Sequence, residues 1–177
     1  MRLTLKSNES GQQDGYDVSL SSYLTLTSPF TYGAANTSSH VWTAADAPIN
    51  LRSEINLFYH LNLMHDYFFA DVNKSSAAPV IRPVVAMAHV GPNMVNAFYN
   101  PDNGNLFFGD VSAGTPSDAL TDDATVVRHE YTHYVVDRIW PLLNFGQSGA
   151  ISEAVADYFS GSSLNNSSIG KYYNNTT

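Results

Sequence analysis

The segment from His129 to His133, HEYTH, holds the side chains in this sequence that are best suited to chemistry. Two histidines four residues apart lie on one face of a helix, so both imidazoles can bind one metal ion. Glu130 can lie beside that ion without binding it, where its carboxylate can accept a proton from metal-activated water. The chain has 6 histidines and 4 glutamates in 177 residues. At that composition the pattern arises by chance in roughly 0.5% of sequences, so its presence is informative.

Glu153 decides between a metal site and the alternative, in which both histidines are ordinary surface or core residues. It lies twenty residues after His133, in a second predicted helix. A catalytic zinc site needs a third protein ligand and an open position for water. A short reversing loop and an antiparallel second helix bring Glu153 opposite the two histidines. Asp157, one turn further on, can accept a hydrogen bond from the other ring nitrogen of a ligand histidine.

The elements that position these residues begin with β structure. Residues 16–27 alternate weakly between apolar and polar and predict one strand. Residues 80–90 predict another, which Pro83 places at an edge or a bulge. Two short β runs joined by the turn sequence NPDNG predict a hairpin over 94–109.

Apolar residues at helical spacing predict three helices, over 48–72, 119–139 and 150–164. Ser117 or Asp118 is the expected cap of the second, and Pro141 is expected to end it. We therefore predict an α+β fold, with a β-rich N-terminal lobe over 1–116 that includes the first helix. The zinc-site helices and a mobile tail follow over 117–177.

The composition excludes several function classes. Lys and Arg total 8 against 16 Asp and Glu, a net charge of −8, which disfavours binding to nucleic acid or to anionic membranes. No cysteine is present, so disulfides and thiolate metal sites are excluded. No stretch approaches the ~20 apolar residues of a membrane span, and the first residues do not form a signal peptide. The oligomeric state is left open.

Both metal-site segments resemble the thermolysin-like and fungalysin-like metallopeptidases, the gluzincins. The resemblance rests on HEYTHYVVD, on SGAISEAVADYFSG and on the gap between them, and continues upstream in NAFY and NLFFGD. The helix containing NLFYHLNLMHDY is similar to the fungalysin-type version of the family's N-terminal helix. Together these matches cover residues 48–162.

The resemblance implies a zinc endopeptidase that cleaves protein or peptide substrates outside the cell. It implies His129, His133 and Glu153 as zinc ligands and Glu130 as general base. Asp157 is then expected to orient His129. Ser152 stands where an Asn often supports the second histidine. Asn96, through its side chain, and Ala97, through its carbonyl, are expected to align the substrate as an added strand.

Departures from the family pattern mark what this chain lacks. Asn144 stands where thermolysin-like enzymes have an oxyanion-stabilising Tyr, and Thr125 replaces a calcium-ligating Asp. Calcium is therefore possible but not supported by the expected ligands. The C-terminal lobe of the family, with its specificity pocket and a catalytic His, is not found after Glu153, so we expect a fragment of a longer enzyme. The alternative function is a zinc-binding module that binds extended peptides without cleaving them, but the intact Glu130 favours hydrolysis.

Overall fold

The computed structural model describes residues 17–21, 24–27, 49–68, 84–90, 94–110 and 119–170 of the chain. Within them, five strands form one sheet and three α-helices pack beside it. Strands and helices are largely segregated along the chain, so the predicted α+β class is confirmed. Among these residues, no helix has the length and apolar character that crossing a membrane requires.

The sheet combines parallel and antiparallel pairs. Strands β1 (Asp17–Ser21) and β2 (Leu24–Thr27) are antiparallel, and β2 runs parallel to β3 (Val84–Met87). Next to β3 lies β5 (Asn105–Phe108), also parallel, followed by the antiparallel β4 (Ala97–Asn100). The resulting order, β1-β2-β3-β5-β4, leaves β4 at an edge of the sheet.

Two expectations about strands are wrong. The single strand predicted over 16–27 is two strands that reverse direction, and no Gly, Pro or Asn between them signals the turn. The strand predicted over 80–90 was placed at an edge or bulge, but β3 has a partner on each side. Strand β3 begins at Val84 and contains no proline, so each of its residues has an N–H for the ladder, and Pro83 lies outside the described residues.

The hairpin of β4 and β5 lies within the predicted range 94–109 and is closed by its turn residues. Gly104 has a φ of 74° and donates its N–H to the Asn100 carbonyl oxygen at 2.8 Å. A positive φ favours glycine, which has no Cβ to clash. The Asn100 side chain accepts a second bond, from the Asp102 N–H at 2.9 Å. These local bonds fix the register of the edge strand.

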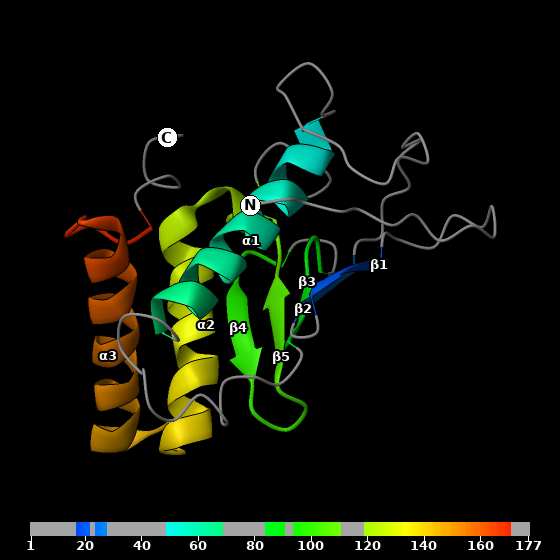
Figure 1. Ribbon diagram of the computed structural model, residues 1–177. Helices are drawn as coiled ribbons and strands as arrows, with labels where there is room; N and C mark the ends of the chain where they lie inside the picture. The colour runs from blue at the N-terminus through cyan, green and yellow to red at the C-terminus, as the bar shows by residue number, and fades with distance from the viewer. Residues whose placement is uncertain are drawn as a thin grey trace.

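In the described part of the chain, the sheet is accompanied by three α-helices and one short 3-10 helix. They are α1 (Ile49–Asp66), the 3-10 helix η3 (Leu120–Asp122), α2 (Ala124–Ile139) and α3 (Gly146–Leu164). In Figure 1, α2 stands between α3 on one side and β4 and β5 on the other, and α1 crosses it. The helix that carries the HEYTH segment therefore packs against α1, α3 and the edge hairpin.

The helix boundaries differ from those predicted. Helix α1 ends at Asp66, before the predicted 72, although residues 69–72 lie outside the described ranges. Helix α2 begins after Asp123, whose side chain accepts a bond from the Thr125 N–H at 2.8 Å; the expected caps at 117 and 118 lie outside the described ranges. Helix α3 begins at Gly146, four residues before the predicted start at 150, and has no capping side chain that could have marked this start in the sequence.

One hydrophobic core joins the sheet to the helices. Its fully buried members come from α1, β3, β5 and α2, and the largest include Leu57, Leu61, Val84, Phe108 and Tyr131. The core therefore crosses the expected boundary between 1–116 and 117–177. Because the site helix shares its core with the edge hairpin, their relative position is fixed by packing.

Candidate metal centre

The two histidines of α2 lie side by side. The Nε2 atoms of His129 and His133 are 3.0 Å apart, and the rings meet edge to face with centroids 4.7 Å apart. This follows from their spacing, since residues four apart on a helix occupy the same face. Both side chains are largely buried, with 15% of each exposed.

Glu153 on α3 completes the cluster. Its Oε2 lies 3.2 Å from His129 Nε2, and its Oε1 lies 3.4 Å from His133 Nε2. The ligand atoms of the three residues all lie within 4.8 Å of one another. The carboxylate is 65% exposed, so the open side of the cluster faces solvent and can admit water or a substrate.

The second ring nitrogen of each histidine is held by α3. Asp157 Oδ1 is 2.9 Å from His129 Nδ1, and Ser152 Oγ is 3.0 Å from His133 Nδ1. A bond at Nδ1 fixes the ring orientation and leaves Nε2 free to bind a metal. Helix α3 therefore contributes the third donor and both orienting groups.

Hydrogen bonds just before His129 on α2 help to set the antiparallel alignment of α2 and α3. Near the start of α2, the Thr125 carbonyl accepts a bond from Ser160 Oγ at 2.6 Å. One turn on, the buried Arg128 donates to the Ser163 carbonyl at 2.9 Å. Both α3 partners lie near the C-terminal end of that helix, so the two helices run in opposite directions and Glu153 comes back to the histidines.

The donor set fits zinc. Two imidazole nitrogens and one carboxylate form a three-ligand set of the kind catalytic zinc sites use, with a position left for water. Across the described residues, this is the one group of three or more His or acidic side chains with donors close enough to share an ion. Calcium prefers six to eight oxygen ligands, which this group does not offer. Asp123, near the expected calcium position, caps α2 instead.

Glu130 lies in a different environment from the exposed Glu153. Only 7% of it is exposed, and burial is the main cause that raises its pKa to about 7. The Glu153 charge adds to this rise, while His129 and a bond from the Tyr99 backbone N–H oppose it. Burial also lowers the pKa of His133, and His129 adds to that effect. The two carboxyls therefore lie in different environments, with Glu130 buried and Glu153 exposed.

The edge strand runs beside Glu130. The Asn96 carbonyl accepts the Gly109 N–H at 2.9 Å, so Asn96 directs its backbone groups toward β5. In an antiparallel pair this direction alternates, and Ala97 and Tyr99 therefore present their N–H and C=O groups to the open edge. Of the two residues expected to bind substrate, Ala97 has its backbone on that edge, and Asn96 is exposed just before it.

A comparison with protein families shows which family the chain belongs to. A family model described as "Thermolysin metallopeptidase, catalytic domain" matches residues 4–137. The chain belongs to this family. The match includes His129, Glu130 and His133 and ends before Glu153, so the third donor of this thermolysin-family chain is assigned on geometry.

Relatives of this thermolysin-family chain include two curated bacterial proteins. Bacillolysin of Bacillus cereus is 31% identical over 136 residues, which are 73% of this chain and 24% of that protein. An extracellular metalloprotease of Pectobacterium carotovorum is 30% identical over 102 residues, which are 58% of this chain and 28% of that protein. The chain therefore spans about a quarter of the length of these relatives.

A solved structure shares the fold. The precursor of protealysin, a metalloproteinase from Serratia proteamaculans, aligns with a TM-score of 0.58. The alignment covers 91% of this chain and 46% of that one, at 18% identity. At this identity the likeness shows the fold alone.

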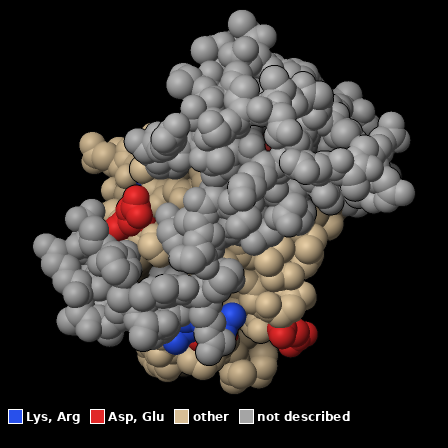
Figure 2. Space-filling model, turned by 45° about the vertical axis from the view of Figure 1, so that its right-hand side comes forward, with Lys and Arg blue, Asp and Glu red and all other residues tan. Residues whose placement is uncertain are grey.

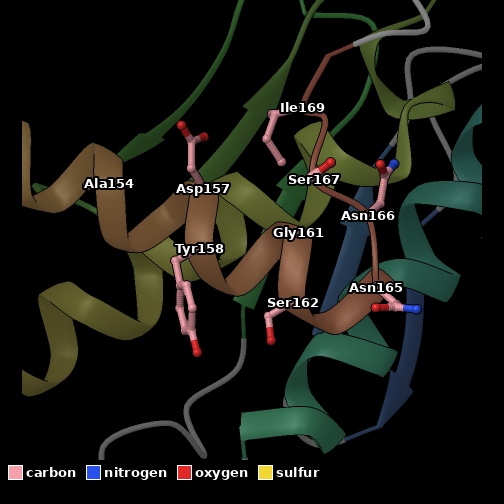
Figure 3. A pocket seen from close by; sticks show the side chains of 9 residues that line it. All are labelled: Ala154, Asp157, Tyr158, Gly161, Ser162, Asn165, Asn166, Ser167 and Ile169. Atoms are coloured by element: carbon pink, nitrogen blue, oxygen red, sulfur yellow. The ribbon is translucent and has the colours of Figure 1, made fainter.

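Two hollows of this thermolysin-family chain are lined in part by residues of α3. A cavity of about 40 Å³ is lined by His133, Ser152 and Asn144, which places the residue found where a Tyr was expected next to a predicted ligand. A wider hollow of about 670 Å³ lies against α3 and the segment after it (Figure 3). Asp157 is the one predicted site residue among its lining residues. The smaller cavity is therefore the one next to the chemistry.

Tyr99 and Asp137 line the small cavity together with His133 and Ser152, a placement that was not predicted from the sequence. The Tyr99 hydroxyl donates to Asp137 Oδ2 at 2.7 Å, joining β4 to α2. Asp137 follows His133 by four residues, so its place on the same helical face was readable in the sequence. Its partner was not, because that contact depends on how the strand docks on the helix.

Proposed function

We propose that the chain is a zinc-dependent metalloendopeptidase, or the metal-binding part of one, that cleaves protein or peptide substrates outside the cell. The convergence of His129, His133 and Glu153 beside the buried Glu130 is the observation that supports it most. The names of the relatives support the reaction class, and one of them is called extracellular.

In this proposal each residue has a distinct role. His129, His133 and Glu153 hold zinc, which when bound polarises the substrate carbonyl and acidifies water. Glu130 accepts a proton from the attacking water and donates it to the nitrogen of the leaving amine. A pKa near 7 suits a group that must do both at neutral pH. Asp157 and Ser152 keep both Nε2 atoms directed at the metal.

Substrate binding is assigned to the edge strand β4. An extended peptide can add to a free sheet edge through backbone hydrogen bonds, largely regardless of its sequence. The Ala97 carbonyl on that edge, together with the Asn96 side chain, is proposed to hold the substrate beside Glu130.

On the face in Figure 2, few of the described side chains are basic. With the net charge of −8, this supports the expectation that neither nucleic acid nor an anionic membrane is a partner.

Zinc content and peptide hydrolysis measured on the same samples test the proposal. Wild type is expected to bind one zinc and cleave casein or a peptide. Glu130→Gln is expected to keep the zinc and lose hydrolysis, whereas His133→Ala loses both. Asp66→Asn, an exposed change on α1, serves as the matched control. Hydrolysis that survives Glu130→Gln contradicts the base. Bound zinc without any hydrolysis by wild type favours the alternative, a module that binds extended peptides without cleaving them.

A further inference from the structure

Tyr99 contacts α2 at two separate points. Its backbone N–H donates to the Glu130 carboxylate, and its side-chain hydroxyl donates to Asp137 Oδ2 at 2.7 Å. Glu130 and Asp137 are seven residues apart on α2, about 10 Å along the helix axis. One residue of the edge strand therefore spans two turns of the helix that carries both histidines.

The Tyr99 side chain is well held in this position. Its ring meets the Tyr134 ring edge to face, with centroids 6.0 Å apart. Burial and the hydrogen bond to Asp137 raise the pKa of the Tyr99 phenol well above its usual value. The phenol therefore stays protonated at neutral pH and remains a hydrogen-bond donor to the carboxylate.

The backbone N–H of Tyr99 lies on the open edge of β4. The alternation set by the bond from Gly109 to Asn96 sends the groups of Ala97 and Tyr99 away from β5. Among the described strands, none lies on that side of β4 to accept either N–H. The Glu130 carboxylate accepts the hydrogen bond from the Tyr99 N–H. The backbone groups of Ala97, two residues earlier, face the open edge, where a peptide can bind.

We propose that Tyr99 is a positioning residue that fixes the distance and register between the substrate-binding edge at Ala97 and the base Glu130. The inference rests on the proposed function and deepens it. An edge strand is paired on one side only, so a clamp to α2 limits the sliding and fraying that one-sided pairing permits. Small errors in the placement of a reacting group are costly, at up to about 100-fold in rate.

Amide hydrogen exchange, followed by NMR on the 177-residue chain, tests the clamp without using activity. In wild type the Tyr99 amide is expected to be protected at least about tenfold more than the Ala97 amide, although both face the open edge. Tyr99→Phe and Asp137→Ala are expected to remove most of that protection. Tyr59→Phe, a matched change at an exposed tyrosine of α1, leaves it unchanged. A Tyr99 amide that exchanges as fast as that of Ala97 in wild type overturns the proposal.

Kinetics on the same variants separate positioning from simple stability. Tyr99→Phe and Asp137→Ala are expected to lower kcat/KM about 10-fold or more with zinc content unchanged, and the double variant is expected to lose no more than either single one. Additive losses, or a loss that parallels zinc release, contradict the clamp. If wild type does not hydrolyse peptides, the proposed function fails, and the exchange pattern still decides whether Tyr99 is clamped to Glu130 and Asp137.

Discussion

Arg128 and His60 join α2 to α1 in the protein interior. The arginine Nε lies 3.2 Å and its Nη2 3.1 Å from Nδ1 of the histidine. Because the guanidinium can only donate, Nδ1 accepts and the imidazole is neutral. Burial, followed by the charge of Arg128, lowers the pKa of His60 to about 4, against a smaller opposing effect of Asp123.

Stability is expected to depend on pH through His60. Its pKa of about 4 in the folded chain is below the 6.5 of an exposed histidine, so between these values the unfolded chain binds a proton that the native chain does not. The free energy of unfolding therefore falls as pH falls from 6.5 to 4, by about 2 kcal/mol from this residue. Urea unfolding at several pH values, with a chelator present, measures it.

The difference between wild type and His60→Gln isolates this contribution, since other groups titrate in the same window. The variant is expected to show a shallower dependence on pH between 4 and 6.5. Parallel curves for the two proteins contradict a neutral buried His60.

Asp157 and Ser152 are expected to affect zinc affinity unequally. Asp157→Asn removes the negative charge behind His129 and should weaken zinc binding about 10- to 100-fold. Ser152→Ala removes a neutral hydrogen bond behind His133 and should weaken it only about 2- to 5-fold. Competition with a chelator of known affinity measures both, with the exposed Ser162→Ala as control. A larger loss from Ser152→Ala reverses the assignment.

Zinc is expected to stabilise the fold through its ligands and not through the base. Zinc at 100 times its dissociation constant should raise the free energy of unfolding by about 2.7 kcal/mol. The gain is expected to persist in Glu130→Gln and to shrink sharply in Glu153→Gln. Urea unfolding with zinc and with a chelator measures it. An equal gain in both variants is evidence against Glu153 as a ligand.

Gly109 is expected to tolerate no side chain. A Cβ there lies 1.7 Å from the Met94 carbonyl oxygen, so Gly109→Ala must move the backbone just before β4. We expect a loss of about 3 kcal/mol or more. Gly146→Ala is the control, since its Cβ meets nothing within 4 Å and only its φ of 60° is unfavourable; it should cost about 1 kcal/mol. Equal losses point to a general cost of replacing glycine.

The sequence was most informative where chemistry and local periodicity coincide. The i, i+4 spacing of His129 and His133 needs only a helix to bring them together, and Glu153 needs only a reversal of the chain. The α+β class followed from the order of the patterns. These features depend on few contacts, which is why they could be predicted.

Features that depend on docking could not be read from the sequence. Tyr99 meets Asp137 only because β4 packs on α2, and the two lie 38 residues apart in the chain. Asp123 caps α2 because the residues before it, Leu120–Asp122, form a 3-10 helix. The helix therefore begins later than its predicted start at 119. The reversal between β1 and β2 was missed because its residues carry no turn signal.

Helix α3 carries Ser152, Glu153 and Asp157 within two turns, and all three meet side chains of α2. A shift of α3 by one residue rotates it by about 100°, which moves all three away from the histidines together. The three contacts therefore form or break together, as α3 docks on α2 or moves away from it. Metal affinity should therefore depend on the fraction of molecules in which α3 is docked on α2. Insertions in the loop before α3 should be tolerated only if they keep the rotation of α3 about its axis unchanged.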